Sequence, residues 1–493
     1  MKKTYHHRKW WAIAGVMVAI LCIVPGIFFY HNFMRQTKGN LIEILPSNAL
    51  YILQINDNKD FVKSSALFLP VFNSLLYLDA LSGFEFFIDQ MPVSGEPTPV
   101  LISCYPKDNK PVLLFTSRAH EITFRSLLKS LKIDARNFIP FGNEKIYAYG
   151  VNYHKYYFCL YNKVFLVSED IELLKKSIVQ QKYPRTLLSD KSFAHLYQEI
   201  ITKNNKQNWL IVNHELFLDA LLPKINQSFQ PVFFHLKELS SWSAFLIDDH
   251  EGDLVLSGYT LAQSTWLQVF TQNIDKESFT IPTHLFPANT LFFTTMKLSD
   301  PEQFARCHPV TDAVVAQDFL SLQPRVSGLF GIQTDSVIQY YGFLLADSLH
   351  PLPVPEAIDS MEVISPRKNT FANDIISINR NVFSRVLLSS LPVPPFHYAL
   401  PEKNYYILAD SVSALEKYRI VMQQGALSTR ALNKFVQAAI PSSSRYDFCI
   451  FPTENFPLFP DIHTCSITLC VLSFSPPERG VLPVNIRLKM LQR

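Results

Sequence analysis

One opening motif occurs twice in this chain of 493 residues, and the repetition constrains the fold more than any other feature. LPSNALYILQIND (Leu45–Asp57) returns as FPANTLFFTTMKL (Phe286–Leu298), at an offset of 241 residues. At the same offset, KVFLVSEDIELLKKSIVQQ (Lys163–Gln181) matches NYYILADSVSALEKYRIVMQQ (Asn404–Gln424). Two separated matches at one offset indicate a tandem duplication.

The second matched pair predicts a strand followed by a helix in each copy. Aromatic and β-branched residues, which are typical of strands, end near Ser168 and near Asp410. Acidic or hydroxyl residues follow, and their side chains can cap the free amides of a helix. Ile171, Leu174 and Ile178 then recur at helical spacing and give that helix one buried face.

Each copy also closes with an apolar strand and a hairpin. NWLIVNHE (Asn208–Glu215) resembles YDFCIFPTE (Tyr446–Glu454), and two apolar strands follow each segment. The polar joints DDHEGD (Asp248–Asp253) and SPPERG (Ser475–Gly480) contain the glycine expected in a hairpin loop. Strands follow one another more often than they alternate with helices such as Glu121–Leu131, which predicts an α+β fold with antiparallel sheets.

The N-terminal segment predicts a membrane anchor. WWAIAGVMVAILCIVPGIFFY (Trp10–Tyr30) contains no charge, and its 21 residues at about 1.5 Å each are enough to cross a hydrocarbon core. The run is longer than the apolar region of a usual signal peptide, and no small-residue cleavage site follows, so we expect an uncleaved signal-anchor. Four basic residues precede it, which places the rest of the chain on the exported side.

These observations predict an α+β chain: an N-terminal transmembrane helix followed by a tandem duplication of two mainly antiparallel α+β domains. The predicted segments are a cytoplasmic tail (1–9), the signal-anchor helix (10–30), a juxtamembrane linker (31–44), ectodomain repeat 1 (45–271), a linker (272–284) and ectodomain repeat 2 (285–493). The expected location is the inner membrane, single-pass, with residues 10–30 in the lipid bilayer and the C-terminal ectodomain in the periplasm.

Charge and cysteine content narrow the classes of function. Residues 1–44 hold six Lys/Arg and one acidic residue, so the remainder has 39 basic and 41 acidic residues. A nearly neutral ectodomain is not a nucleic-acid footprint. Six cysteines follow the anchor, mostly within apolar strand-like runs, which favours buried free thiols over disulfides. Cys465 and Cys470 are five residues apart on one predicted strand, so they face opposite sides and cannot pair.

Motifs for catalysis, cofactors or metals give only weak candidates. The chain contains no P-loop, GxGxxG, HExxH or GxSxG motif. DDHEGDL (Asp248–Leu254) could offer carboxylates to calcium, but a solvated hairpin tip explains it better. NHELFLD places His214, Glu215 and Asp219 close together, although acids at a helix start explain them better. The adjacent Cys307 and His308 point apart on any regular element. We therefore assign no catalytic, cofactor-binding or metal-binding residue.

A tyrosine-rich hairpin is the strongest candidate for a binding surface. YAYGVNYHKYYFCLY (Tyr147–Tyr161) holds the candidate residues Tyr147, Tyr149, Tyr153, Tyr156 and Tyr157. An exposed aromatic side could stack on glycans or peptide. A strand pair whose aromatic rings face the core, with tyrosine hydroxyls at its rim, explains the pattern better, so these tyrosines are weak candidates.

The anchor, the LPSN opening at Leu45–Asn48 and the long α+β repeats resemble the bacterial domain-of-unknown-function 3352 family. That resemblance implies a location in the cell envelope and supplies no catalytic residues. The sequence favours a membrane-tethered, non-enzymatic binding or assembly module whose partner is an envelope protein or a glycan. The alternative is an exported enzyme that acts on envelope polymers, with its site between the two repeats.

Overall fold

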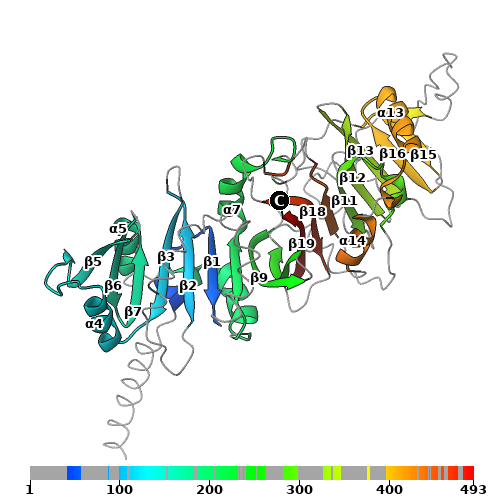
Figure 1. Ribbon diagram of the computed structural model, residues 1–493. Helices are drawn as coiled ribbons and strands as arrows, with labels where there is room; N and C mark the ends of the chain where they lie inside the picture. Colours follow the sequence, from blue (N-terminus) through cyan, green and yellow to red (C-terminus); the bar gives the residue numbers. More distant parts are fainter. Residues whose placement is uncertain are drawn as a thin grey trace, which may run out of the picture.

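The computed structural model shows an elongated molecule organised along one antiparallel sheet (Figure 1). It describes residues 41–56, 87, 99–107, 111–151, 154–180, 186–204, 206–230, 233, 237, 240–250, 253–262, 281–297, 326–334, 337–345, 375–377, 396–402, 404–429, 432–441, 444, 446–453, 457–459, 465–475 and 481–492.

The described strands divide into two sets along the chain. The first set is β1 (Tyr51–Ile55), β2 (Val100–Tyr105), β3 (Val112–Arg118), β4 (Ile139–Phe141), β5 (Glu144–Val151), β6 (His154–Tyr161), β7 (Val164–Ser168), β8 (Trp209–Asn213), β9 (Ser240–His250) and β10 (Asp253–Ala262). The second set is β11 (Thr290–Lys297), β12 (Val326–Thr334), β13 (Val337–Leu345), β14 (Ile376–Ser377), β15 (Tyr398–Glu402), β16 (Tyr405–Ala409), β17 (Tyr446–Ile450), β18 (Cys465–Phe474) and β19 (Leu482–Gln492).

Both sets are paired in the same order. Outward from the centre, the first half runs β10-β9-β8-β1-β2-β3-β7-β6-β5. The second half runs β19-β18-β17-β11-β12-β13-β16-β15-β14. Tyr51 and Phe292, which the repeat aligns, pair with Val212 of β8 and Ile450 of β17. This shared order supports the proposal that the chain arose by duplication.

Two long hairpins join the halves at the centre of the molecule. β9 pairs with β10 and β18 with β19, as the sequence predicts. β10 then pairs antiparallel with β19, from Leu254 opposite Leu488 to Thr260 opposite Leu482. The two sheets therefore continue into each other through main-chain hydrogen bonds.

The predicted fold class is wrong. We expected a transmembrane helix followed by two α+β domains, whereas the described residues are dominated by one large antiparallel sheet that passes through both halves. The error arises because strand periodicity does not show which strands pair, and the two closing hairpins pair with each other. The predictions of a membrane-bound, single-pass chain are likewise not supported. No helix within the described ranges has the length and apolar character needed to cross a membrane, and Trp10–Tyr30 lies outside those ranges.

Short helices cover parts of the sheet. They are α4 (Glu121–Ser130), α5 (Ile171–Gln180), α6 (Lys191–Leu196), α7 (His214–Leu221), α13 (Val412–Gln423) and α14 (Leu432–Ala439). Four begin at a polar side chain that accepts a hydrogen bond from a free backbone amide: Asp170 for α5, Asp190 for α6, Asn213 for α7 and Ser411 for α13. The helix predicted at Glu121–Leu131 and the strand-to-helix step of both copies are confirmed.

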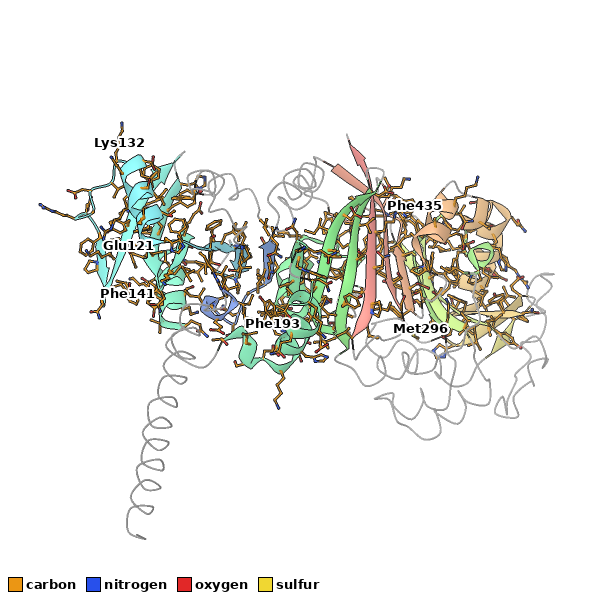
Figure 2. All side chains as sticks on the ribbon, turned by 90° about the horizontal axis from the view of Figure 1, so that it is seen from below. Glu121, Lys132, Phe141, Phe193, Met296 and Phe435 are labelled. Carbon is orange, nitrogen blue, oxygen red and sulfur yellow. The ribbon has the colours of Figure 1, made fainter. Side chains whose placement is uncertain are left out.

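Side chains alternate between the two faces of the sheet and form different cores on each. One face carries an apolar cluster that continues through both halves, and we call it the shared core; it includes Leu50, Leu53, Phe245, Leu291 and Phe448. On the opposite face, α5 and α6 cover a cluster of the first half, and α13 and α14 cover a separate cluster of the second. Phe193 of the first half and Met296 and Phe435 of the second lie far from Glu121, Lys132 and Phe141 at one end (Figure 2).

Candidate functional site

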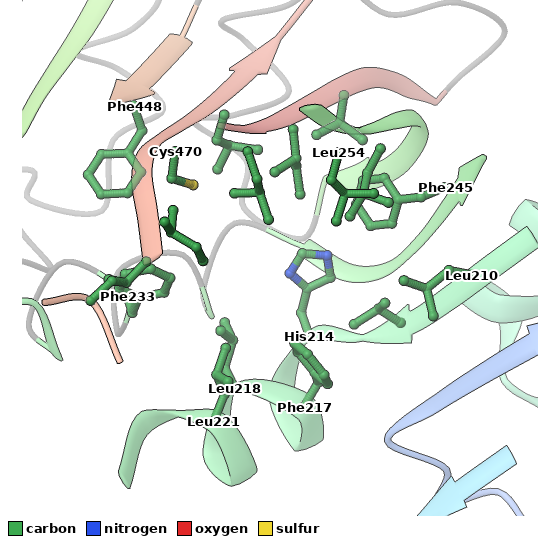
Figure 3. Close-up of a pocket in the computed structure, with 18 of the residues that line it drawn as sticks. Leu210, His214, Phe217, Leu218, Leu221, Phe233, Phe245, Leu254, Phe448 and Cys470 are labelled. Atoms are coloured by element: carbon green, nitrogen blue, oxygen red, sulfur yellow. The ribbon is translucent and has the colours of Figure 1, made fainter. Parts of the chain in front are cut away.

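An apolar cavity of about 190 Å³ lies on the shared-core side of the central hairpins (Figure 3). Side chains from α7, β8, β9 and β10 with Phe233 line one part of it, and side chains from β17, β18 and β19 with Leu458 and Phe459 line the other. Among them are Leu218, Phe245, Leu254, Phe448 and Cys470. Because the lining comes from both halves, neither half forms the cavity alone.

Among the described lining residues, His214 is the one strongly polar side chain, and Figure 3 shows it projecting into the cavity from the side of α7. Its Nε2 atom lies 2.6 Å from Ser243 Oγ. The Ser243 hydroxyl donates to Thr260 Oγ1 at 2.6 Å, and Thr260 donates to the carbonyl oxygen of Trp242 at 3.3 Å. Since each hydroxyl donates its proton to the next acceptor, Nε2–H donates to Ser243 and Nδ1 is left as an acceptor.

His214 and Ser243 lie as close as a catalytic base and its nucleophile. The hydrogen bond between them has the opposite direction, however, because the ring nitrogen donates to the serine oxygen. Burial lowers the pKa of His214 to about 4, so the ring is neutral near pH 7. A ring nitrogen that donates to Ser243 cannot remove the serine proton, and the described residues place no carboxylate against the other nitrogen. The arrangement therefore fixes the orientation of the imidazole and does not activate a nucleophile.

Glu215 and Asp219, which the sequence grouped with His214, do not gather beside it. Both are exposed on α7, and Asp219 forms an ion pair with Lys237, whose Nζ lies 2.8 Å from its Oδ1. Consecutive helix positions point in different directions, so proximity along the chain did not produce a cluster.

The residues predicted as a possible calcium site, and the adjacent Cys307 and His308, do not form a site either. Asp248 is exposed, whereas Asp253 is buried and pairs with Arg487 of β19 at 3.1 Å. That ion pair links the two halves beside the seam, which is the line along which β10 pairs with β19. Cys307 and His308 lie outside the described residues. Within the described ranges, no group of three or more His, Cys, Asp or Glu side chains could hold a metal ion.

The tyrosines of the predicted binding hairpin lie largely in the core. Tyr147 and Tyr156 are buried, and the ring of Tyr147 stacks on Phe158 with centroids 5.8 Å apart. Tyr149 and Tyr157 are half-buried, and Tyr153 lies outside the described residues. β5 and β6 thus place most of these rings among apolar neighbours, which leaves little aromatic surface for stacking on a glycan.

The cysteine side chains that the structure describes are buried free thiols. They are Cys104, Cys159, Cys449 and Cys470, and burial raises the pKa of the Cys470 thiol to about 12. A thiol so far from ionisation is a poor nucleophile, so Cys470 contributes apolar surface to the cavity.

A buried carboxyl lies outside the cavity, on the opposite face of the second half. Asp447 is fully buried; the hydroxyls of Ser444 and Thr295 donate to it, the latter at 3.0 Å. Burial raises the pKa of Asp447 to about 6, although the hydroxyl groups and nearby Lys297 oppose that shift. The carboxyl is therefore held in the fold by neutral hydroxyl partners.

Asp447 should make stability fall as pH rises. The folded protein binds this proton more tightly than the unfolded chain, so the contribution is full below about pH 4 and is lost as pH rises through about 6. We expect Asp447→Asn to remove about 3 kcal/mol of pH dependence over that range. Urea unfolding of both proteins from pH 4 to 7 measures the difference, with exposed Glu121→Gln as the control. If the free energy of unfolding depends on pH equally in wild type and Asp447→Asn, the pKa of the Asp447 carboxyl is not raised in the folded protein.

Sequence reasoning identified His214 but missed the cavity around it. The apolar lining residues look like ordinary core positions in the sequence, and only their placement on both sides of the seam creates a site. A weak signal was the histidine within NHELFLD, because its counterpart segment PTENFPL has none.

Comparisons with known proteins do not extend these findings. No family model and no curated protein matches this chain. A solved structure, crystal form I of TP0453, is similar with a TM-score of 0.17 and 8% identity, covering 78% of this chain and 97% of that one. A likeness this low carries no structural or functional inference.

Proposed function

We propose that this chain is a non-enzymatic binding module that takes up an apolar ligand in the central cavity. The observation that carries the proposal is the lining itself, which is aliphatic and aromatic apart from His214 and the Cys470 thiol. Pockets for small molecules are typically concave and mostly apolar, with few polar groups that fix orientation. The shape of the duplicated sheet supports the same function, because the cavity forms only where the two halves meet.

The size of the cavity limits the occupant. A volume of about 190 Å³ is somewhat larger than an engineered cavity of roughly 150 Å³ that binds benzene. It is smaller than the usual pockets of about 300–1,000 Å³ for drug-sized ligands. An aromatic ring or a short aliphatic chain fits, either as a whole ligand or as one end of a longer molecule.

An enzyme with its site between the two halves is the alternative that the sequence offered. The central cavity occupies that place, but its one histidine donates to Ser243 and lacks a second ionisable group beside it among the described residues. Binding is therefore the function that the geometry supports best.

Filling the cavity tests the proposal. We expect Cys470→Phe to place a ring in the cavity and to weaken binding of the neutral fluorophore N-phenyl-1-naphthylamine by at least about tenfold, because the added ring takes up volume that the phenyl end of the fluorophore would fill. The measurement is the fluorescence rise on titration, with one binding site expected per wild-type chain.

Ile122→Phe is the matched control, since it adds a similar ring at a side chain that is 83% exposed on α4. Thermal unfolding checks that both variants fold, and Leu472→Phe provides a second filling variant. Unchanged binding in the folded filling variants, or no saturable binding in the wild type, would contradict the proposal.

A further inference from the structure

We propose that the ligand of the central cavity is an apolar molecule carrying a single hydroxyl group, which donates a hydrogen bond to Nδ1 of His214. This inference rests on the proposed function and specifies the class of ligand. It follows from the position of one acceptor atom in a lining that is otherwise apolar.

The hydrogen-bond chain behind His214 defines which nitrogen accepts. Ser240 donates to Thr260 Oγ1 through a short hydroxyl–hydroxyl contact, and Thr260 donates to the carbonyl oxygen of Trp242. Ser243 donates to Thr260, so its oxygen can only accept from Nε2–H. Three hydroxyl side chains from β9 and β10 thus hold the imidazole of His214 in one tautomer.

The remaining nitrogen, Nδ1, has no protein partner among the described residues, and Figure 3 shows the ring facing the cavity. An acceptor on an apolar wall is costly to cover with a purely apolar group, because its hydrogen bond to water is lost without replacement. A ligand that brings a donor to this atom avoids that loss, whereas an alkane of the same shape does not.

The charge of the surroundings selects a neutral donor. Among the described residues the cavity lining contains no lysine or arginine, so a carboxylate there would be buried without a compensating cation. An ammonium group would equally lack an anionic partner in the described lining, because Glu215 and Asp219 are exposed on α7 and do not line the cavity. The low pKa of His214, about 4, agrees with a ring that stays neutral and accepts. A hydroxyl group is both neutral and a donor.

Four probes with one aromatic body test this inference: toluene, benzyl alcohol, benzyl methyl ether and benzoate. Each displaces N-phenyl-1-naphthylamine from the wild-type protein at pH 7 if it binds. The ether keeps the oxygen but has no donor. We expect benzyl alcohol to bind roughly three- to tenfold more tightly than the ether, the range for one neutral hydrogen bond, and benzoate to bind most weakly.

His214→Phe isolates the imidazole. In this variant we expect the preference for benzyl alcohol over toluene to fall by roughly three- to tenfold relative to the wild type. Phe217→Leu is the control, because Phe217 also lines the cavity but offers no acceptor. It should weaken both probes and leave their ratio unchanged.

The outcomes separate the two proposals. If toluene and the fluorophore fail to bind the wild type, the cavity is not an apolar ligand site and the proposed function fails. If toluene binds, but the ether matches benzyl alcohol or benzoate binds as tightly as the alcohol, only the hydroxyl assignment is overturned. The comparison of alcohol with ether uses the wild type alone, so it stands even if His214→Phe does not fold.

Discussion

Replacing Gly258 by alanine should lower the free energy of unfolding by about 3 kcal/mol, the upper range for overpacking a filled interior. Gly258 lies in β10, opposite Phe245 of β9 and Val484 of β19. A Cβ atom there would lie 2.8 Å from the Cα of Phe245 and closer still to the carbonyl oxygen of Ala244. These neighbours are backbone atoms of a paired strand, so they can give way only if the hairpin moves.

Gly150→Ala is the matched control for this prediction. Gly150 lies in β5 near one end of the sheet, and the nearest atom to an added Cβ is the His154 carbonyl oxygen at 3.9 Å. We expect a change within about 1 kcal/mol, because glycine to alanine alters intrinsic strand preference only modestly. Urea unfolding of the two variants gives both values. A loss in Gly258→Ala no larger than in Gly150→Ala would show that the central hairpins are not packed this closely.

The local structure of this protein follows closely from its sequence. The repeat at an offset of 241 residues aligns Tyr51 with Phe292, and the structure places them at matching positions of β1 and β11. Ser411 opens α13 as a cap, and β9 and β10 pair up to His250 opposite Asp253, at the predicted polar joint. Each of these features depends on neighbouring residues, whose preferences are visible in a short window.

The arrangement of the halves could not be predicted in the same way. Leu254 and Leu488 face each other across the seam although they are 234 positions apart, and each has only the alternating pattern of any half-buried strand. Two separate domains and one continuous sheet satisfy that pattern equally well. The candidate site could not be predicted for the same reason. His214 contacts Ser243 within its own half, but it lines one cavity with Cys470 only because β10 pairs with β19.

The continuity of the sheet changes what a core mutation should do. Leu50 lies just before β1, and Leu291 lies within β11. Their side chains are 3% and 0% exposed, and both belong to the shared core. In two separate domains, which the sequence predicts, each leucine would lie in the core of its own copy, and damage would stay in the mutated half. The structure instead places both in one apolar cluster that crosses the seam.

Leu50→Ala or Leu291→Ala should therefore cost roughly 2–5 kcal/mol, as for other buried leucines, and should destabilise both halves together. Limited proteolysis at increasing urea concentration measures this, because cleavage in each half reports the opening of that half. We expect cleavage of both halves at the same lowered urea concentration, while exposed Val337→Ala leaves the transition unchanged. Cleavage confined to the mutated half would mean that the β10–β19 pairing does not couple the halves. Since that pairing is also what brings the two sides of the cavity together, independent opening would remove the structural basis of the binding site as well.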